Sequence, residues 1–541
     1  MTLRMGIRTI SPADGTRRVD LSQKVALALR FSPALVFVSA LALYALTLAP
    51  TVLWGGGDFA RFQVWAAALR LEGGAEGHPL WVALAHVFTA LPLGDSAYRV
   101  NLSSAVFSAA ALSLVHITIY DLIIMAPQTK TRSHGLVAAR LGAWFGTISL
   151  AVSHTFWTYA VMPKVYSLNS LIFAAALLCA VRWSRARRTV YLYGLAVALG
   201  VGAVAHLLFF ALTPAFLVYI VLVMRERATG DGRWTHVVGA ALLYIVLVGA
   251  GFALLHAITV GSTDYADAGG TGIGFIHQFL QVLVSPHALA LGLGVFVALM
   301  GYQFFLTLLV VAVGVRVVLV QRPLAALFFL LVILDVAFVF AWLPGTPRLG
   351  DYAQNWHFYL PSYMVLAVLA GLGAARLWTR LTTERACALG AIALVLPIVA
   401  YAAAPRLARG VITRLDLRTL PGRDNAAYLL SPWKQGEHGA RAFGTATLRA
   451  LSPHAVLLAD YSIYWVVRYL HDVEGVRKDV TLIELAAPPA LDQQTSVVLH
   501  AAGMGAPLYI ADNNRYYNIA AFEHAFRIVP TAPVYRLLPR H

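Results

Sequence analysis

The sequence has few charged residues and almost no cysteine, and both shortages limit what the protein can be. Only 12% of its 541 residues are charged, about half the share that is usual in a soluble chain, whereas 59% are hydrophobic and the mean hydropathy is +0.71. Its two cysteines, Cys179 and Cys387, both lie inside apolar runs, so no disulfide scaffold is available. Disordered, collagen-like and disulfide-rich classes are therefore excluded, and the composition indicates a chain that resides in a bilayer.

Long apolar runs predict a mostly α polytopic membrane protein with about 11 transmembrane helices, because a bilayer core needs roughly 20 mostly apolar residues per helix. The runs lie near 31–50, 101–124, 138–161, 165–183, 189–206, 207–224, 236–259, 292–315, 323–343, 358–377 and 386–405. The stretch 79–92 is also apolar but too short to span, so we predict an interfacial or re-entrant helix there.

Basic residues are unevenly divided between the two sides that these runs define. Before residue 405, the loops on one side carry only five of them: Arg61, Arg70, Arg99, Lys164 and Arg348. Because cytoplasmic loops collect Lys and Arg, that side is predicted to be extracytoplasmic, with the N-terminus in the cytoplasm. The net charge of +16 then describes membrane orientation, and no nucleic-acid partner is expected. The first apolar run has no small-residue cleavage site after it, so it is expected to anchor the chain.

The chain divides into three predicted parts. Residues 1–30 form a cytoplasmic N-terminal segment, and residues 31–405 form the transmembrane domain, with a first outer loop at 51–100. After Pro405, strand-length segments at 454–460, 479–486, 507–512 and 534–538 alternate with helical stretches such as 462–473. This alternation predicts an extracytoplasmic α/β domain over 406–541. Alanine- and arginine-rich usage with few cysteines favours a bacterial inner membrane.

Asp58 is the candidate catalytic residue in the first outer loop. It follows three glycines just past the first apolar run, at the boundary between water and bilayer. A carboxylate at this position suits a general base that meets a lipid-borne substrate. The alternative is a helix N-cap, because a helical-looking segment begins here, and one carboxylate can fill both roles.

Other polar residues on the outer side suit the binding of a lipid phosphate, because Arg and Lys bind phosphate well. They are Lys164, Tyr166, His78, Arg99, His206, Arg348, His357 and Tyr359. Each one could instead anchor the chain at the interface by snorkelling. Asp264, Asp267 and Asp351 are candidates for contacts with an acceptor or a cation. No Cys/His/Asp cluster has the spacing of a metal site, so no cofactor is required by the sequence and a divalent cation stays open.

Asp335 lies in the middle of an apolar run, where burial of a charge costs roughly 2.5–3.5 kcal/mol. It therefore should face protein or a wet cavity. It is either a carboxylic acid paired with a neighbouring hydroxyl or a relay residue of a transporter.

Several segments together resemble a family of polytopic membrane proteins whose animal relatives are transmembrane protein O-mannosyltransferases, which are GT-C-fold glycosyltransferases. The resemblance starts with TLAPTVLWGGGDF, at residues 47–59, and continues with GHPLWVALAHVFTALPLGDSAYRVNLSSAVFSA. It continues in HTFWTYAVMPKVYSLNSL (154–171), GVGAVAHLLFFALTPA (200–215), HFYLPSYMVLAVLAGLG (357–373) and VEGVRKDVTLIEL (473–485). The likeness thus runs from near residue 45 into the C-terminal domain.

The resemblance implies a GT-C-like fold and a membrane hexosyltransferase. Such enzymes move a sugar, here mannose-like, from a polyprenyl-phosphate lipid to an extracytoplasmic acceptor hydroxyl on a protein, lipid or glycan. An acidic residue in the first outer loop is their catalytic centre. The resemblance places Asp58 in that role, as the base of an inverting single displacement.

The sequence departs from the family pattern at two places near this centre. The family usually has an Asp directly after the loop Trp and a Glu three residues later, where this chain has Gly55 and Asp58. A Glu usually precedes the Val-Tyr pair, where this chain has Lys164. Two alternatives therefore stand beside the transferase: a polyprenyl-lipid transporter or flippase that uses Asp335, and a catalytically inactive relative that binds glycolipid.

Overall fold

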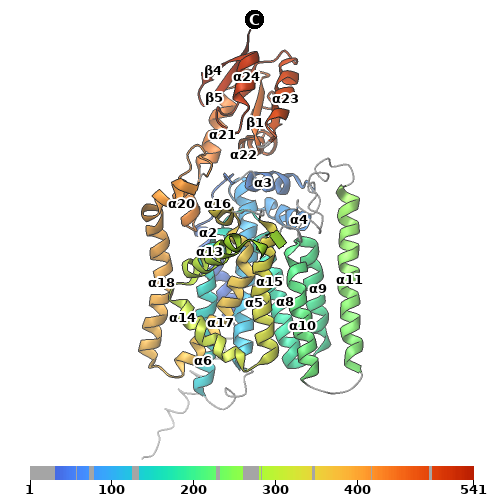
Figure 1. Ribbon diagram of the computed structural model, residues 1–541, viewed down its shortest axis with the longest axis vertical. Helices are drawn as coiled ribbons and strands as arrows, with labels where there is room; N and C mark the ends of the chain where they lie inside the picture. The colour runs from blue at the N-terminus through green and yellow to red at the C-terminus, as the bar shows by residue number, and fades with distance from the viewer. Residues whose placement is uncertain are drawn as a thin grey trace, which may run out of the picture.

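The structure is a computed structural model that describes residues 31–55, 58–71, 78–124, 133–226, 232–259, 280–281, 283–343, 348–415, 417–486 and 490–540. A layer of long, roughly parallel helices occupies one part of the molecule, and a small domain with a sheet stands on one end of it (Figure 1). The short helices α3 and α4 lie crosswise between the two (Figure 1). This architecture confirms the predicted fold class.

The helical part runs from Ser32 to Leu407. Its helices are α2 (Ser32–Leu46), α3 (Asp58–Ala68), α4 (Pro79–Val87), η1 (Phe88–Ala90), α5 (Ser96–Ile124), α6 (Ser133–Ala151), α7 (His154–Ala160), α8 (Tyr166–Ala186), α9 (Thr189–Ala205), α10 (Leu208–Arg225), α11 (Gly232–Thr259), α13 (Pro286–Phe304), α14 (Thr307–Leu319), α15 (Arg322–Trp342), α16 (Leu349–Asn355), η3 (Trp356–Tyr359), α17 (Leu360–Trp378) and α18 (Thr383–Leu407).

In the described part of the chain, eight helices are long and apolar enough to cross a membrane, or nine if the bent pair α6–α7 forms one span. The predicted number of about 11 is therefore not confirmed. Two predicted spans, 31–50 and 189–206, correspond to α2 and α9, which are shorter apolar helices. The predicted run 292–315 is divided between α13 and α14. The apolar stretch 79–92 forms α4 and η1, which together are too short to cross.

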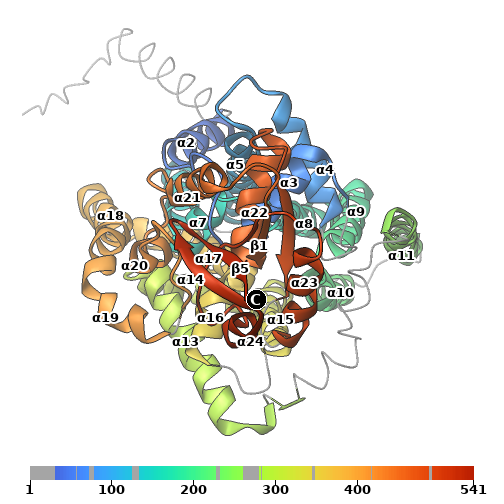
Figure 2. The same cartoon turned by 90° about the horizontal axis from the view of Figure 1, so that it is seen from above.

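Helix α17 lies at the centre of the bundle, and α11 lies at its edge (Figure 2). Of the 18-residue apolar segment in each span, 94% is buried for α17 and 6% for α11. Glycines allow the neighbours of α17 to approach closely. A Cβ atom on Gly314 of α14 would lie 1.9 Å from the Leu369 carbonyl oxygen, and one on Gly373 would lie 2.0 Å from that of Val310. Small residues at such contacts let helix backbones touch, which stabilises helix pairs in a bilayer where apolar burial gives little.

The C-terminal part begins with juxtamembrane elements and ends in a five-stranded sheet. Its elements are α19 (Arg409–Ile412), η4 (Thr413–Leu415), α20 (Asn425–Leu430), α21 (Gly439–Ala450), β1 (Val456–Asp460), α22 (Tyr461–Arg468), η5 (Tyr469–Val473), β2 (Thr481–Leu485), α23 (Asp492–Ala502), β3 (Leu508–Ile510), α24 (Ile519–Ala525), β4 (Phe526–Thr531) and β5 (Val534–Pro539). The four predicted strand segments are β1, β2, β3 and β5, and β4 is the strand that the sequence pattern missed.

The strand order is β2-β1-β3-β5-β4, with β1 parallel to β2 and β3, and β5 antiparallel to β3 and β4. The chain leaves β1, adds β2 on one side and then β3 on the other. In open α/β sheets, a crevice forms at the carboxyl ends of strands where the order reverses in this way. Here that position is the end of β1, at Asp460.

The sheet domain is fixed onto the first loop by polar and aromatic contacts. Arg441 binds Asp95 at 2.9 Å from Nη1 to Oδ2, and its Nη2 lies 2.7 Å from Glu474 Oε2. The rings of Trp65 on α3 and Trp465 on α22 are 5.9 Å apart. These contacts hold the carboxyl end of β1 over the N-terminus of α3.

Candidate active site

A cavity of ≈580 Å³ lies where the helical part meets the sheet domain. Its lining comes from the start of α3, the α7–α8 junction, η3, the juxtamembrane segment and the end of β1. The polar lining residues are Asp58, Thr158, Tyr159, Lys164, Tyr166, Asn355, His357, Arg418, Arg423, Tyr428, Asp460, Tyr461, Ser462 and Tyr516. Of the predicted residues, it thus brings together Asp58, Lys164, Tyr166 and His357.

Asp58 is the first residue of α3, and its carboxylate is held by three side chains. Lys164 donates from Nζ to Oδ2 at 2.7 Å, whereas Tyr461 and Arg61 donate to Oδ1 at 2.8 and 3.2 Å. Among the described residues, the carboxylate of Asp58 thus accepts hydrogen bonds from side chains and from no backbone N–H group of α3. The contacts do not include the N-cap bond that was the alternative reading.

The environment of Asp58 keeps its carboxylate ionised. Burial opposes the charge and by itself would raise the pKa. The ammonium of Lys164 and the guanidinium of Arg61, together with hydrogen bonds from Lys164 and Tyr461, outweigh burial and hold the pKa of Asp58 well below its ordinary range. Its side chain remains 38% exposed toward the cavity. Oδ2 has one described donor, so a lone pair remains for a substrate hydroxyl.

Lys164 reaches Asp58 from the turn between α7 and α8. Its side chain is only 12% exposed, and Nζ lies 5.3 Å from the Phe62 ring centre and 5.6 Å from that of Tyr166. Aromatic faces attract a cation at this range. The ammonium is therefore fixed at the cavity wall, where it can bind an anionic substrate group beside Asp58.

The three predicted histidines and Tyr166 form one cluster of rings next to Lys164. The ring centre of Tyr166 lies 4.1 Å from that of His357 and 5.7 Å from that of His206, which stacks on His78 at 5.3 Å. The Nδ1 atom of His78 lies 3.1 Å from the Ala205 carbonyl, and burial lowers the pKa of His78 to about 4. His78 is therefore neutral near pH 7 and acts as a hydrogen-bonding and packing group instead of a phosphate-binding cation.

Four other predicted residues lie outside the cavity lining. Arg99 binds the carbonyl oxygens of Thr89 and Leu91 at 2.8 and 3.0 Å and so fixes its own loop. Asp351 Oδ2 accepts from the Arg348 backbone N–H at 2.7 Å, at the N-terminus of α16. Tyr359 is fully buried among aromatic rings. Asp264 and Asp267 lie outside the described residues.

Sequence reasoning missed the half of the cavity that the sheet domain supplies. Asp460 ends β1 and forms a bidentate pair with Arg418, whose guanidinium lies 4.3 Å from the Tyr516 ring centre. Asp460 Oδ2 also accepts from Tyr517 Oη at 2.8 Å. The carboxyl end of a parallel strand was the available indication for these residues, because that edge is where α/β sheets bind ligands.

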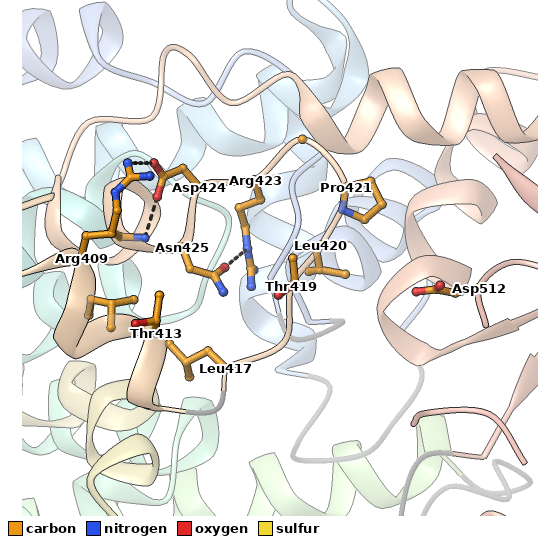
Figure 3. Close-up of a pocket in the computed structure, with 13 residues that line it drawn as sticks. Arg409, Thr413, Leu417, Thr419, Leu420, Pro421, Arg423, Asp424, Asn425 and Asp512 are labelled. Atoms are coloured by element: carbon orange, nitrogen blue, oxygen red, sulfur yellow. Dashed lines mark hydrogen bonds and ion pairs between the residues drawn. The ribbon is translucent and has the colours of Figure 1, made fainter. Parts of the chain in front are cut away.

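A second, larger cavity of ≈950 Å³ lies outside the first, along residues 409–426 and opposite Asp512 (Figure 3). The two cavities share three lining residues, Leu417, Leu420 and Arg423. Arg423 donates from Nε to Asn425 Oδ1 at 2.8 Å, and Arg409 pairs with Asp424 at the far wall (Figure 3). The two cavities therefore adjoin each other along these three residues.

Asp335 does not line this cavity. Asp335 on α15 is fully buried, and its Oδ2 accepts from the backbone N–H and hydroxyl of Ser362 on α17 at 3.0 and 2.5 Å. This is the pairing with a hydroxyl that the sequence offered as one reading.

Among the described residues, no group of three His, Cys, Asp or Glu side chains is placed to hold a metal ion.

Gly55, one of the positions where the sequence departs from the expected family pattern, has no room for a side chain. A Cβ atom on Gly55 would lie 1.8 Å from Cδ2 of Phe59. The Phe59 ring therefore occupies the space that a side chain at position 55 would need.

Part of the chain matches a known family and a curated relative. Residues 62–229 match the family described as the protein O-mannosyl-transferase TMEM260 N-terminal domain. Over 160 residues, the chain is 33% identical to protein O-mannosyl-transferase TMEM260 of Mus musculus. The resemblance expected from the sequence is confirmed. That alignment covers 29% of this chain and 20% of the mouse protein, so the chain spans about a fifth of the length of this relative.

Two solved structures have the same overall fold. ArnT from Cupriavidus metallidurans bound to undecaprenyl phosphate superposes with a TM-score of 0.59 at 13% identity, covering 94% of this chain and 98% of that one. The apo form of the same protein gives a TM-score of 0.57 at 14% identity, with the same coverage. The fold therefore extends over both the helical part and the sheet domain.

Proposed function

We propose that this chain is an integral membrane glycosyltransferase of the GT-C type. It would move a mannose-like hexose from a polyprenyl-phosphate lipid to an acceptor hydroxyl on a protein, lipid or glycan. We further propose that the cavity faces the extracytoplasmic side of a bacterial inner membrane, with residues 1–30 in the cytoplasm and 406–541 outside. The names of the matched relative and of the fold neighbour, a protein O-mannosyl-transferase and a protein bound to undecaprenyl phosphate, support this choice.

The observation that carries the proposal is the ion pair between Asp58 and Lys164 in the cavity where the helical part meets the sheet domain. The carboxylate supplies a base with an open lone pair, and the ammonium supplies positive charge within 2.7 Å of it. Acceptor activation needs a base, and stabilisation of a departing phosphate needs a positive charge, and this cavity supplies both.

In the proposed reaction, Asp58 takes the proton of the acceptor hydroxyl while the acceptor oxygen attacks the anomeric carbon of the donor sugar. The bond between that carbon and the phosphate oxygen breaks, and the electron pair leaves with the polyprenyl phosphate. Lys164, and Arg423 at the outer side of the cavity, would stabilise the charge on this leaving group. Attack from the face opposite the phosphate inverts the anomeric configuration. Holding both reactants in line supplies much of the rate.

The test is an assay of the full-length protein in lipid nanodiscs with undecaprenyl-phosphate-[¹⁴C]mannose. Extracytoplasmic proteins, glycans and membrane lipids of the source cell serve as acceptors. We expect label to leave the lipid and to appear in one acceptor fraction, with release of undecaprenyl phosphate. Binding of the lipid without any loss of label from it would contradict the transferase and support the inactive relative.

The inactive relative is favoured by one observation, the closed position at Gly55. The chain cannot place a second acid there without moving Phe59, so it must work with a single carboxylate beside Lys164. The transporter alternative has less support, because both described contacts of Asp335 are with Ser362 and describe packing between α15 and α17.

A further inference from the structure

A small internal slot adjoins the Asp58 cavity between the first turns of α8, α10 and α17. Its volume is ≈10 Å³, counted for the centre of a water-sized group, which is room for about one such group. Two residues, Tyr166 and His357, line both the slot and the cavity. The slot therefore adjoins the cavity at the part of the wall that these two side chains form.

Asn169 and His357 are two of the polar residues that line this slot. The side chain of Asn169 is 6% exposed, and among the described residues neither its amide nitrogen nor its amide oxygen has a hydrogen-bond partner. His357 is equally buried. Its Nδ1 lies 2.9 Å from Tyr159 Oη, whereas its Nε2 has no described partner. The next residue behaves differently, because the Ser170 hydroxyl donates to the Tyr166 carbonyl at 2.9 Å.

An amide buried without partners costs free energy, so such a group persists where something else completes its hydrogen bonds. The Asn169 amide offers both an acceptor and donors, and a neutral imidazole nitrogen is either a donor or an acceptor. A hydroxyl group both donates and accepts, and it has the size of the slot. The rest of the lining is largely apolar, so a charged group would be poorly solvated there.

We propose that the slot formed by Asn169 and His357 binds one hydroxyl group of the donor hexose and thereby selects the sugar that is transferred. This inference rests on the proposed function. A hexose with its anomeric carbon beside Asp58 and its phosphate beside Lys164 would place one ring substituent past Tyr166 and His357 into the slot.

The experiment compares undecaprenyl-phosphate-mannose with its monodeoxy analogues as donors for the full-length protein in nanodiscs. For the unaltered protein, we expect kcat/KM to fall about 10- to 100-fold for one deoxy donor, because a site built to bind a hydroxyl rejects the analogue that lacks it. Asn169→Leu should use the complete donor poorly and should discriminate less than about threefold against that same analogue.

The control is Thr213→Val, which removes a buried hydroxyl on α10 that donates to the Phe209 carbonyl at 2.7 Å. It should keep the discrimination of the unaltered protein. Thermal unfolding and gel filtration of each variant establish that it is folded.

Two results would overturn the inference. One is an equal loss of kcat/KM for all donors in Asn169→Leu, which would mean that the slot holds water or only supports packing. The other is a set of deoxy donors that the unaltered protein uses equally well. If no donor is turned over at all, the proposed function fails, and the inference is then decided by donor binding measured as a shift in melting temperature. Equal shifts in melting temperature with undecaprenyl-phosphate-mannose and with every deoxy donor would overturn the inference.

Discussion

At the scale of single residues, the contacts of Asp58 determine what kind of base it can be. Lys164 and Arg61 hold its pKa below the ordinary range, so the carboxylate is already ionised at any pH near neutrality. A base with a low pKa takes a proton late, as the new bond to the acceptor oxygen forms. Lys164 therefore has to be close enough to stabilise the phosphate and yet leave one lone pair of Oδ2 for the acceptor.

Tyr461→Phe removes the donor that reaches Asp58 from the sheet domain. Because that hydrogen bond lowers the pKa of Asp58, its loss raises the pKa toward the ordinary value. The carboxylate is then protonated at a higher pH, so the loss of transfer activity on acidification begins at higher pH than in the unaltered protein. At neutral pH, we expect kcat to fall about 3- to 30-fold. A loss of this size corresponds to the removal of one hydrogen bond to a charged group.

The pH profile of kcat/KM measures this effect. Tyr464→Phe is the matched control, because Tyr464 lies on the same helix and its hydroxyl is bound by Arg468. An acid limb that stays in place in Tyr461→Phe would contradict the assigned contact.

Gly55→Asp introduces the acid that the sequence resemblance leads us to expect at this position, and we expect it to destabilise this protein. The new Cβ would overlap the Phe59 ring, and overpacking of this kind costs about 1–3 kcal/mol. In the double variant with Phe59→Ala, the space is free, so the two losses of stability should be less than additive by about 1 kcal/mol. Thermal unfolding of the single and double variants measures the coupling.

Gly436→Asp serves as the control, since nothing lies within 4 Å of a Cβ at that position. Additive losses for Gly55→Asp and Phe59→Ala would show that Phe59 does not close the position.

The sequence predicted the membrane-side half of the site but not the half from the sheet domain. Asp58, Lys164 and His357 were found because few polar groups lie on the outer side of so apolar a chain. Arg418 and Tyr461 belong to a domain with ordinary polar composition, where the end of the predicted strand 454–460 indicates the edge that binds a ligand but not which polar residues line it. Their position follows from the strand order and from the docking of α22 on α3, which are tertiary features.

At the scale of elements, the split of one apolar run into α13 and α14 shows where the pattern was insufficient. The break lies at Phe305, which has a φ of +44°, although neither Gly nor Pro stands there. Apolar composition predicts that a segment is buried or in lipid, but it does not predict where a turn interrupts the helix. The runs 207–224 and 323–343 were in contrast predicted within a few residues as α10 and α15.

Asp335→Asn tests whether the contact between α15 and α17 is structural. An asparagine oxygen can accept from the backbone N–H and hydroxyl of Ser362 as the carboxylate does. We therefore expect sugar transfer to stay within about twofold of the unaltered protein, because no charge at this position takes part in the reaction. Abolished turnover in a variant that folds normally would instead support an ion-coupling role and the transporter alternative.

At the scale of the whole molecule, the cavity exists only because two parts of the chain meet. The helical part supplies the base and the lysine, and the sheet domain supplies Tyr461 and Arg418. The pair of Arg441 with Asp95 and Glu474 fixes this junction. The sheet domain must therefore lie on the same side of the membrane as the loop that carries Asp58 and Asp95.

Cysteine labelling tests that orientation. Met504 is 52% exposed in the sheet domain, and Thr379 is exposed at the end of α17, on the predicted cytoplasmic side. In a background with Cys179→Ala and Cys387→Ala, a membrane-impermeant maleimide should label Met504→Cys in intact spheroplasts and Thr379→Cys only after lysis. The reverse pattern would contradict the predicted orientation.

The central claim is that Asp58 is the catalytic base, and replacement by Asn tests it most directly. Asp58→Asn keeps the shape of the side chain and removes the charge, and Asp492→Asn on the exposed first turn of α23 is the control. The measurement is the initial rate of [¹⁴C]mannose transfer from the undecaprenyl-phosphate donor at saturating donor concentration. The account predicts a loss of about 10²–10⁴-fold in kcat for Asp58→Asn with donor binding retained, and no loss for Asp492→Asn. A rate for Asp58→Asn within about threefold of the unaltered protein would contradict it.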